Sequence, residues 1–121
     1  MISWQDRTLE RVKDMLKAIA NIRECISSCT KEEFCNSERL SAEAVLGFIV
    51  LGESANRIDK AVQSRYPQIV WHRLVGMRNV LVHEYGKTNY ETIWYTAEND
   101  LAALELNIRE MIAAYPWPVA E

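Results

Sequence analysis

Apolar residues recur at steps of three and four positions along most of this chain, which is the spacing of one face of an α-helix. The stripe nearest the N-terminus predicts a first helix from about Ser3 to Ser28, and its members are Leu9, Val12, Leu16, Ile19 and Ile26, with Arg23 completing the row. The stripe nearest the C-terminus predicts a final helix, and its members are Ile93, Trp94, Ala97, Leu101, Leu104, Ile108 and Met111. Such regular stripes indicate packing in a bundle or a dimer.

Two capping boxes predict helix starts between these stripes. Thr30 followed by Glu33 predicts a short helix around Phe34, because each side chain can bond the backbone N–H of the other residue. Thr88 followed by Glu91 predicts the start of the final helix in the same way.

A long helix is predicted between the short helix and Pro67. Ser37 or Ser41 can cap its start, and we expect it to reach Tyr66, because proline disfavours helical geometry in the residue before it. Its first half, residues 44–51, is apolar nearly all round, which predicts a central position in the fold.

The next helix, from Trp71 to a stop at Gly86, carries the chemistry-bearing residues and is called the motif helix below. At about 100° per residue, one apolar face is shared by Trp71, Leu74, Val75, Leu81, Val82 and Tyr85. Arg78 falls in the middle of this face, so its guanidinium needs a partner or a water-filled pocket.

Asn79 and His83 lie on a neighbouring stripe of the motif helix, which His72 and Gly76 extend toward the helix start. Arg78 and His83 are separated by roughly 140° around an ideal helix, so they do not meet unless the arginine reaches round or the helix loosens. A second copy of the chain could bring the two groups together.

Composition supports an all-α fold. The chain has 121 residues, 49% of them hydrophobic, with only 4 glycines and 3 prolines, which leaves little room for strands and long loops. We expect a single domain over residues 1–121, an up-and-down bundle of four longer helices plus a short one, with an apolar stripe left over for a second subunit.

The net charge of −3 argues against broad electrostatic attraction to nucleic acid. A local basic site remains possible on or beside the long helix and the motif helix, from Arg57, Lys60, Arg65, Arg73, Arg78 and Lys87. For any one of these except Arg78, an ordinary solvated position is the simpler interpretation.

The cellular compartment of the protein and its need for a metal are predicted from signals that are missing from the sequence. It shows neither a signal sequence nor an apolar run near the roughly 20 residues that a membrane span needs, so a cytoplasmic protein without membrane contact is expected. Cys25, Cys29 and Cys35 are odd in number, which fits reduced thiols. Their spacing matches no common zinc pattern, so no metal site is expected.

The sequence of Arg78, four residues, His83, one residue and Tyr85 resembles the signature of the HEPN superfamily, and within it the HepT-like toxins of prokaryotic toxin–antitoxin pairs. The similarity covers nearly the full chain. Its further landmarks, in the expected order, are Leu51-Gly52-Glu53-Ser54-Ala55, Tyr66-Pro67, Trp71, Gly76-Met77-Arg78-Asn79 and Tyr90 through Trp94.

The resemblance implies a HEPN-like helical-bundle ribonuclease that acts on RNA as a homodimer, without metal or other cofactor, with motif helices of two subunits facing each other. Arg78 and His83 match the catalytic positions, and Asn79 matches the polar neighbour of the arginine. Tyr85 matches the tyrosine that the partner, a minimal nucleotidyltransferase antitoxin, modifies with adenylate. Glu53 lies where the family has a Gly-Glu step.

Glu53 has two open interpretations. It can pair with Arg57 four residues later, a contact worth only a few tenths of a kcal/mol if exposed. Alternatively, it approaches the motif helix and holds Arg78 or orients His83 through hydrogen bonds. The spacing supports the first role and the resemblance supports the second.

These residue types suit cleavage of RNA by its own 2′-hydroxyl. His83 would act as general acid or base, Arg78 would stabilise the charge on phosphorus, and Asn79 would position the phosphate. Two alternatives stay open: a non-catalytic nucleotide- or partner-binding module of the same fold, and a helical dimer whose motif residues only satisfy one another.

Overall fold

The structure, a computed structural model, describes residues 3–118, and over this range the chain forms helices joined by loops. The elements in order are α1 (Trp4–Ser27), α2 (Lys31–Asn36), α3 (Glu38–Asn56), α4 (Lys60–Gln63), α5 (Trp71–His83), the 3-10 turn η1 (Tyr85–Lys87) and α6 (Tyr90–Ala113). The predicted all-α class, with four long helices, is confirmed over the described residues.

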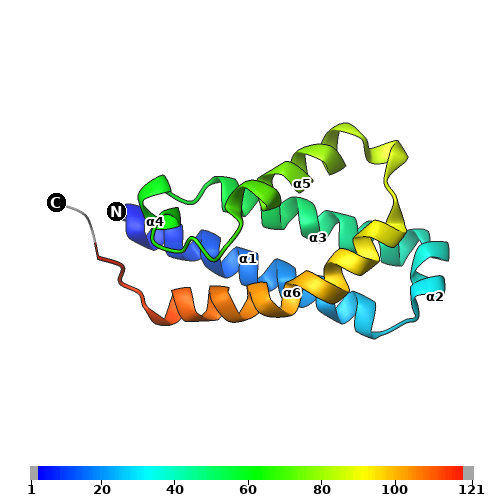
Figure 1. The fold of residues 1–121 in the computed structure, drawn as a ribbon, viewed down its shortest axis with the longest axis horizontal. Coiled ribbons are helices and arrows are strands. Elements are labelled where there is room, and N and C mark those ends of the chain that lie inside the picture. Colours follow the sequence, from blue (N-terminus) through cyan, green and yellow to red (C-terminus); the bar gives the residue numbers. More distant parts are fainter. Residues whose placement is uncertain (1–2, 119–121) are drawn as a thin grey trace.

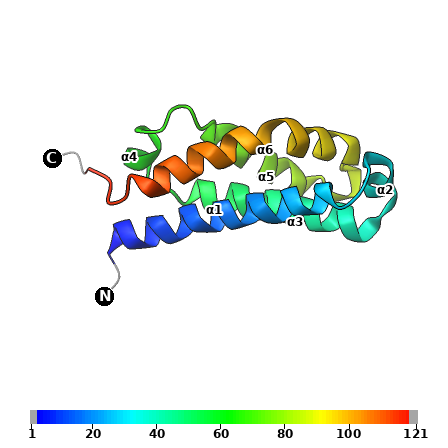
Figure 2. The same ribbon diagram turned by 90° about the horizontal axis from the view of Figure 1, so that it is seen from below.

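The four long helices run alternately up and down along the long axis of the molecule, as Figures 1 and 2 show. α1 packs against both α3 and α6, whereas α5 packs mainly against α3. α5 therefore lies on one flank of the bundle (Figure 1), and much of its surface faces away from the other helices.

The stripe predicted for the final helix is confirmed, because its seven apolar members are the buried residues of α6. The stripe predicted for the first helix is confirmed in part. Val12 and Ile19 are fully buried, but Arg23 is exposed and forms an ion pair with Glu105 of α6. α1 touches helices on two sides, so its buried face is wider than the predicted row and also contains Met15.

The prediction that the third helix reaches Tyr66 is wrong, because α3 ends at Asn56. The chain turns there, and the Gln63 side-chain amide donates hydrogen bonds to the carbonyls of Ala55 and Ile58 at 3.1 and 3.2 Å. The first bond ties the end of α3 to α4, and the second binds a carbonyl of the turn between the two helices. The turn separates off a second short helix, α4, that the sequence pattern did not predict.

Capping side chains agree with the prediction at one helix start and differ at another. Both bonds of the box between Thr30 and Glu33 are present, at 3.1 and 2.9 Å. At α6 the expected box is wrong, because the cap is Asn89, whose side chain accepts from two backbone N–H groups. Thr88 instead donates to the carbonyl of Tyr85 and closes η1.

The apolar first half of α3 is only partly central. Ala44, Phe48 and Leu51 are buried, but Leu46 is 61% exposed and Val50 is 39% exposed. α3 packs against α1 and α5 on its two sides, and neither helix covers the outer stripe that holds Leu46 and Val50. An apolar strip formed by these two side chains is left on the surface of α3.

Candidate functional site

Helix α5 is anchored at its first turn and by a narrow apolar face. Trp71 is buried, and its indole N–H donates to the carbonyl of Tyr66 at 3.2 Å. Leu81 is also buried, but Val82 is 43% exposed and Tyr85 is 58% exposed, so the predicted six-residue apolar face is too wide. α5 packs mainly on one helix, and Tyr85 belongs to η1, after α5 has ended.

Gly52 of α3 allows α5 to come unusually close. A Cβ at position 52 would lie 2.3 Å from the Cβ of Arg78 and 2.5 Å from the carbonyl oxygen of Leu74. Both distances are far below ordinary van der Waals contact. Glycine at this position therefore sets the separation of α3 and α5 and places the first carbon of the Arg78 side chain directly on α3.

Arg78 is held from two directions. Its Nε lies 3.2 Å from Oε2 of Glu53, and an Nη nitrogen donates to Oδ1 of Asn79 at 2.9 Å. The Nε atom is fully buried, yet its N–H does not point at an acceptor among the described residues. The contact with Glu53 is therefore an ion pair without the geometry of a hydrogen bond. The Arg78 side chain is 31% exposed.

Both interpretations of Glu53 are present in the structure. Its Oε1 accepts a hydrogen bond from Nε of Arg57 at 3.1 Å, while its Oε2 faces Arg78. One carboxylate thus bridges the end of α3 to the middle of α5 and leaves the Arg78 side chain partly exposed.

His83 and Tyr85 stand apart from this cluster. His83 is the last residue of α5 and is exposed, and within residues 3–118 no hydrogen bond or ion pair joins it to Arg78. A single chain therefore brings together Glu53, Arg78 and Asn79, and it presents His83 and the Tyr85 phenol separately at the end of the same helix.

A cavity of about 520 Å³ adjoins the motif at Asn79. It lies between α5 and the α4 turn, and its lining includes Asn56, Lys60, His72 and Gly76. The sequence pattern predicted Lys60 only as one of several basic residues and gave no signal for Asn56. The turn that brings both residues to α5 was not predicted.

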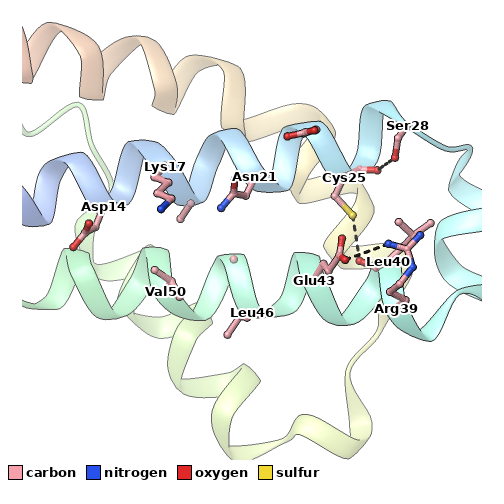
Figure 3. A pocket seen from close by; sticks show the side chains of 13 residues that line it. Asp14, Lys17, Asn21, Cys25, Ser28, Arg39, Leu40, Glu43, Leu46 and Val50 are labelled. Carbon is pink, nitrogen blue, oxygen red and sulfur yellow. Dashed lines mark hydrogen bonds and ion pairs between the residues drawn. The ribbon is translucent and has the colours of Figure 1, made fainter.

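A second cavity, of about 700 Å³, lies between α1 and α3 (Figure 3) and is lined by no residue of the motif. The Cys25 thiol donates to the carbonyl of Leu40 there, and burial raises the pKa of this thiol. The three cysteines are free, and the described residues contain no group of three or more His, Cys, Asp or Glu side chains suited to a metal ion.

A family model described as ribonuclease HepT-like matches residues 15–111.

The chain belongs to the HepT-like ribonuclease family.

The matched segment contains every residue of the candidate site, from Glu53 to Tyr85. Similar curated proteins carry ribonuclease names. "Putative RNase MJ0125" of Methanocaldococcus jannaschii is 30% identical over 105 residues, covering 84% of this chain and 90% of the relative. "Putative RNase MJ1216" of the same organism is 29% identical over 99 residues, covering 82% of each chain.

"Probable ribonuclease HepT" of Thermococcus cleftensis is 26% identical over 97 residues, covering 77% of this chain and 88% of the relative. No solved structure shows a significant match. No helix among the described residues is long and apolar enough to cross a membrane.

Proposed function

We propose that this HepT-like protein is a metal-independent endoribonuclease in which Arg78 and His83 carry the chemistry. The observation that carries the proposal is the placement of Arg78. Its guanidinium is held by Glu53 and Asn79, its side chain is partly exposed, and it lies on the same helix as the exposed His83. Family membership makes RNA the natural substrate class.

The proposed reaction uses the 2′-hydroxyl of RNA as the nucleophile. A general base takes the 2′-hydroxyl proton, the 2′-oxygen bonds to phosphorus, and the bond to the 5′-oxygen breaks as that oxygen receives a proton. The products are a 2′,3′-cyclic phosphate and a 5′-hydroxyl. His83 supplies the proton transfers, and Arg78 stabilises the negative charge that builds on the phosphate oxygens.

The proposal includes a homodimer formed through the motif helix region. Exposed apolar side chains occur on both helices that carry the site, namely Leu46 and Val50 on α3 and Val80 and Val82 on α5. Exposed apolar surface of this kind suits contact with a second subunit. Two copies meeting there would place the His83 of one chain near the Arg78 of the other.

We further propose that the protein is the toxin of a toxin–antitoxin pair and is silenced by a nucleotidyltransferase antitoxin that adenylylates Tyr85. The Tyr85 phenol is 58% exposed and lies two residues after His83, so it is accessible to a partner enzyme. An attached nucleotide would add an anion two residues from His83 and compete with RNA phosphate for the site. RNA and ATP both occur in the cytoplasm, where we expect the protein to act.

Cleavage of labelled total RNA and tRNA in excess chelator tests the chemistry. Wild type is expected to leave cyclic phosphate ends, and His83→Ala is expected to leave the RNA intact. Arg78→Lys keeps the charge but loses the planar fork of donors, so its activity should fall strongly. Saturable RNA binding without cleavage by the unmodified protein would instead assign the fold to a non-catalytic binding module.

Incubation with the antitoxin and ATP, followed by mass spectrometry, tests the control mechanism. Tyr85→Phe is expected to abolish the added adenylate and to keep ribonuclease activity. Tyr95→Phe is the matched control, because Tyr95 is similarly exposed, at 48%, but lies on α6. Adenylate found on the Tyr85→Phe variant would contradict the assignment.

A further inference from the structure

Resting on the proposed function, we infer that the cavity between α5 and the α4 turn is a subsite for one nucleotide of the RNA next to the cleaved bond. Gly76 is one of the residues that line this cavity. A Cβ at position 76 would meet no other atom within 4 Å, although the residue lies in the interior of α5. Glycine in a helix interior costs about 0.5–1 kcal/mol relative to alanine, and packing within the described chain gives no reason for it.

The cavity continues the line of the proposed catalytic residues. His83, Asn79, Gly76 and His72 occupy one stripe of α5. Asn79, Gly76 and His72 line the cavity. The cavity therefore runs from Asn79, which follows Arg78 in the sequence, toward the start of α5. Seven residues of helix from Asn79 to His72 span about 10 Å. A strand bound at His83 would continue along the same stripe of α5 into this space.

The free polar groups of the cavity match the groups of a nucleotide. Within residues 3–118, the Lys60 ammonium and the His72 imidazole make no ion pair or hydrogen bond with another side chain, and both residues are exposed. A cation and a ring N–H donor suit a phosphate. The Asn56 amide is also unengaged and can bond the edge of a base.

Apolar side chains supply a surface for the face of a base. Ile69 and Val75 line the cavity together with the exposed side chain of Val70. Gln63, which also lines it, is already committed to two backbone carbonyls and stiffens the wall. The volume of about 520 Å³ lies within the range of about 300–1,000 Å³ that is usual for small-ligand sites.

Kinetics on two substrates test the subsite. One is a dinucleotide of the sequence that wild type cleaves, and the other is a pentanucleotide that extends it on both sides. Lys60→Gln and His72→Gln are expected to raise KM for the pentanucleotide about tenfold, the loss of roughly one charge-assisted bond, without changing kcat. Neither variant should alter cleavage of the dinucleotide, which leaves the cavity empty.

Gly76→Leu fills the cavity and should have the same selective effect. The matched control is Arg65→Gln, because Arg65 is an exposed cation near α4 that does not line the cavity. An equal rise in KM for Arg65→Gln would reveal diffuse charge attraction and overturn the subsite. A parallel loss on the dinucleotide would overturn it as well.

Three other outcomes separate the inference from the proposed function. If wild type cleaves RNA and all three cavity variants match it on both substrates, the subsite is refuted and the ribonuclease stands. If Gly76→Leu keeps normal RNA kinetics but no longer binds the antitoxin, the cavity belongs to the protein partner. If wild type cleaves neither substrate, the proposed function and the subsite both fail.

Discussion

Replacing Gly52 by alanine tests whether the close approach of α3 and α5 positions Arg78. The added methyl carbon would lie 2.3 Å from the Arg78 Cβ and 2.5 Å from the Leu74 carbonyl oxygen. Ordinary contacts between carbon atoms are about 3.5–4.0 Å. Neither neighbour is the free end of a flexible side chain, so α5 has to retreat by about 1 Å or more.

The expected loss of stability combines two opposing effects. Overpacking of this kind costs about 1–3 kcal/mol, and exchanging a helical glycine for alanine returns about 0.5–1 kcal/mol. We therefore expect Gly52→Ala to lower the free energy of unfolding by about 1–2 kcal/mol. With a denaturant slope of about 2 kcal/mol/M, the urea midpoint falls by about 0.5–1 M.

The loss of activity should exceed the loss of stability. A retreat of α5 by about 1 Å displaces the Arg78 guanidinium, and misplacement on that scale can cost about a hundredfold in rate. RNA cleavage should be measured at a temperature where urea melts show the variant to be folded. An alanine variant with wild-type stability and wild-type kcat/KM would refute the role of Gly52.

Two other glycines provide controls. At Gly47 an added Cβ would clash with the Ile22 side chain, at 2.4 and 3.0 Å, and would meet the Ala18 carbonyl oxygen at an ordinary 3.7 Å, so Gly47→Ala should lose stability but keep ribonuclease activity. At Gly76 an added Cβ meets nothing within 4 Å, so Gly76→Ala should stabilise the protein by about 0.5–1 kcal/mol. Together, Gly52→Ala, Gly47→Ala and Gly76→Ala show whether ribonuclease activity falls because Arg78 is displaced or because the protein is less stable.

Two further predictions concern charges on the surface. Glu53→Gln should reduce RNA cleavage about tenfold, equivalent to roughly 1.4 kcal/mol. It should change the free energy of unfolding by less than about 1 kcal/mol, because the ion pair of Glu53 with Arg78 is partly exposed. Equal activity losses in Glu53→Gln and in the control Arg57→Gln would contradict a specific role of Glu53. The Tyr115 hydroxyl donates a hydrogen bond to Asp6 and lowers the pKa of that carboxyl. The hydrogen bond therefore stabilises the folded state fully above the unfolded-state pKa of Asp6, about 3.9. This stabilisation is lost as the pH falls through the lower folded-state pKa. Tyr115→Phe should therefore destabilise the protein at pH 7, and its difference from wild type in urea melts should shrink below about pH 4; a difference independent of pH would contradict the bond.

Local patterns predicted the elements whose signals lie within a few residues of one another. The apolar stripe of α6 has the predicted members, and the box between Thr30 and Glu33 forms as expected. Periodicity failed where bonds between distant residues decide the path. α3 ends at Asn56, where Gln63, seven residues later, binds the Ala55 carbonyl across a turn that no local pattern predicts.

The identity of the candidate residues was available from the sequence, because Arg78, Asn79 and His83 stand at recognisable spacings on one helix. Their arrangement depended on tertiary contacts. No local pattern reveals that a Cβ is missing opposite Arg78, or that Glu53 reaches two arginines at once.

Helix periodicity and capping act over three or four residues, so the sequence alone is enough to predict the all-helical class, most helix positions and a set of candidate residues for RNA chemistry. Three features become visible only in the folded chain: α5 lies against Gly52, Glu53 bridges Arg57 and Arg78, and a cavity opens beside Asn79. These features arise from contacts between segments far apart in the chain. Their geometry depends on how close two helices can pack, and no single helix encodes that distance.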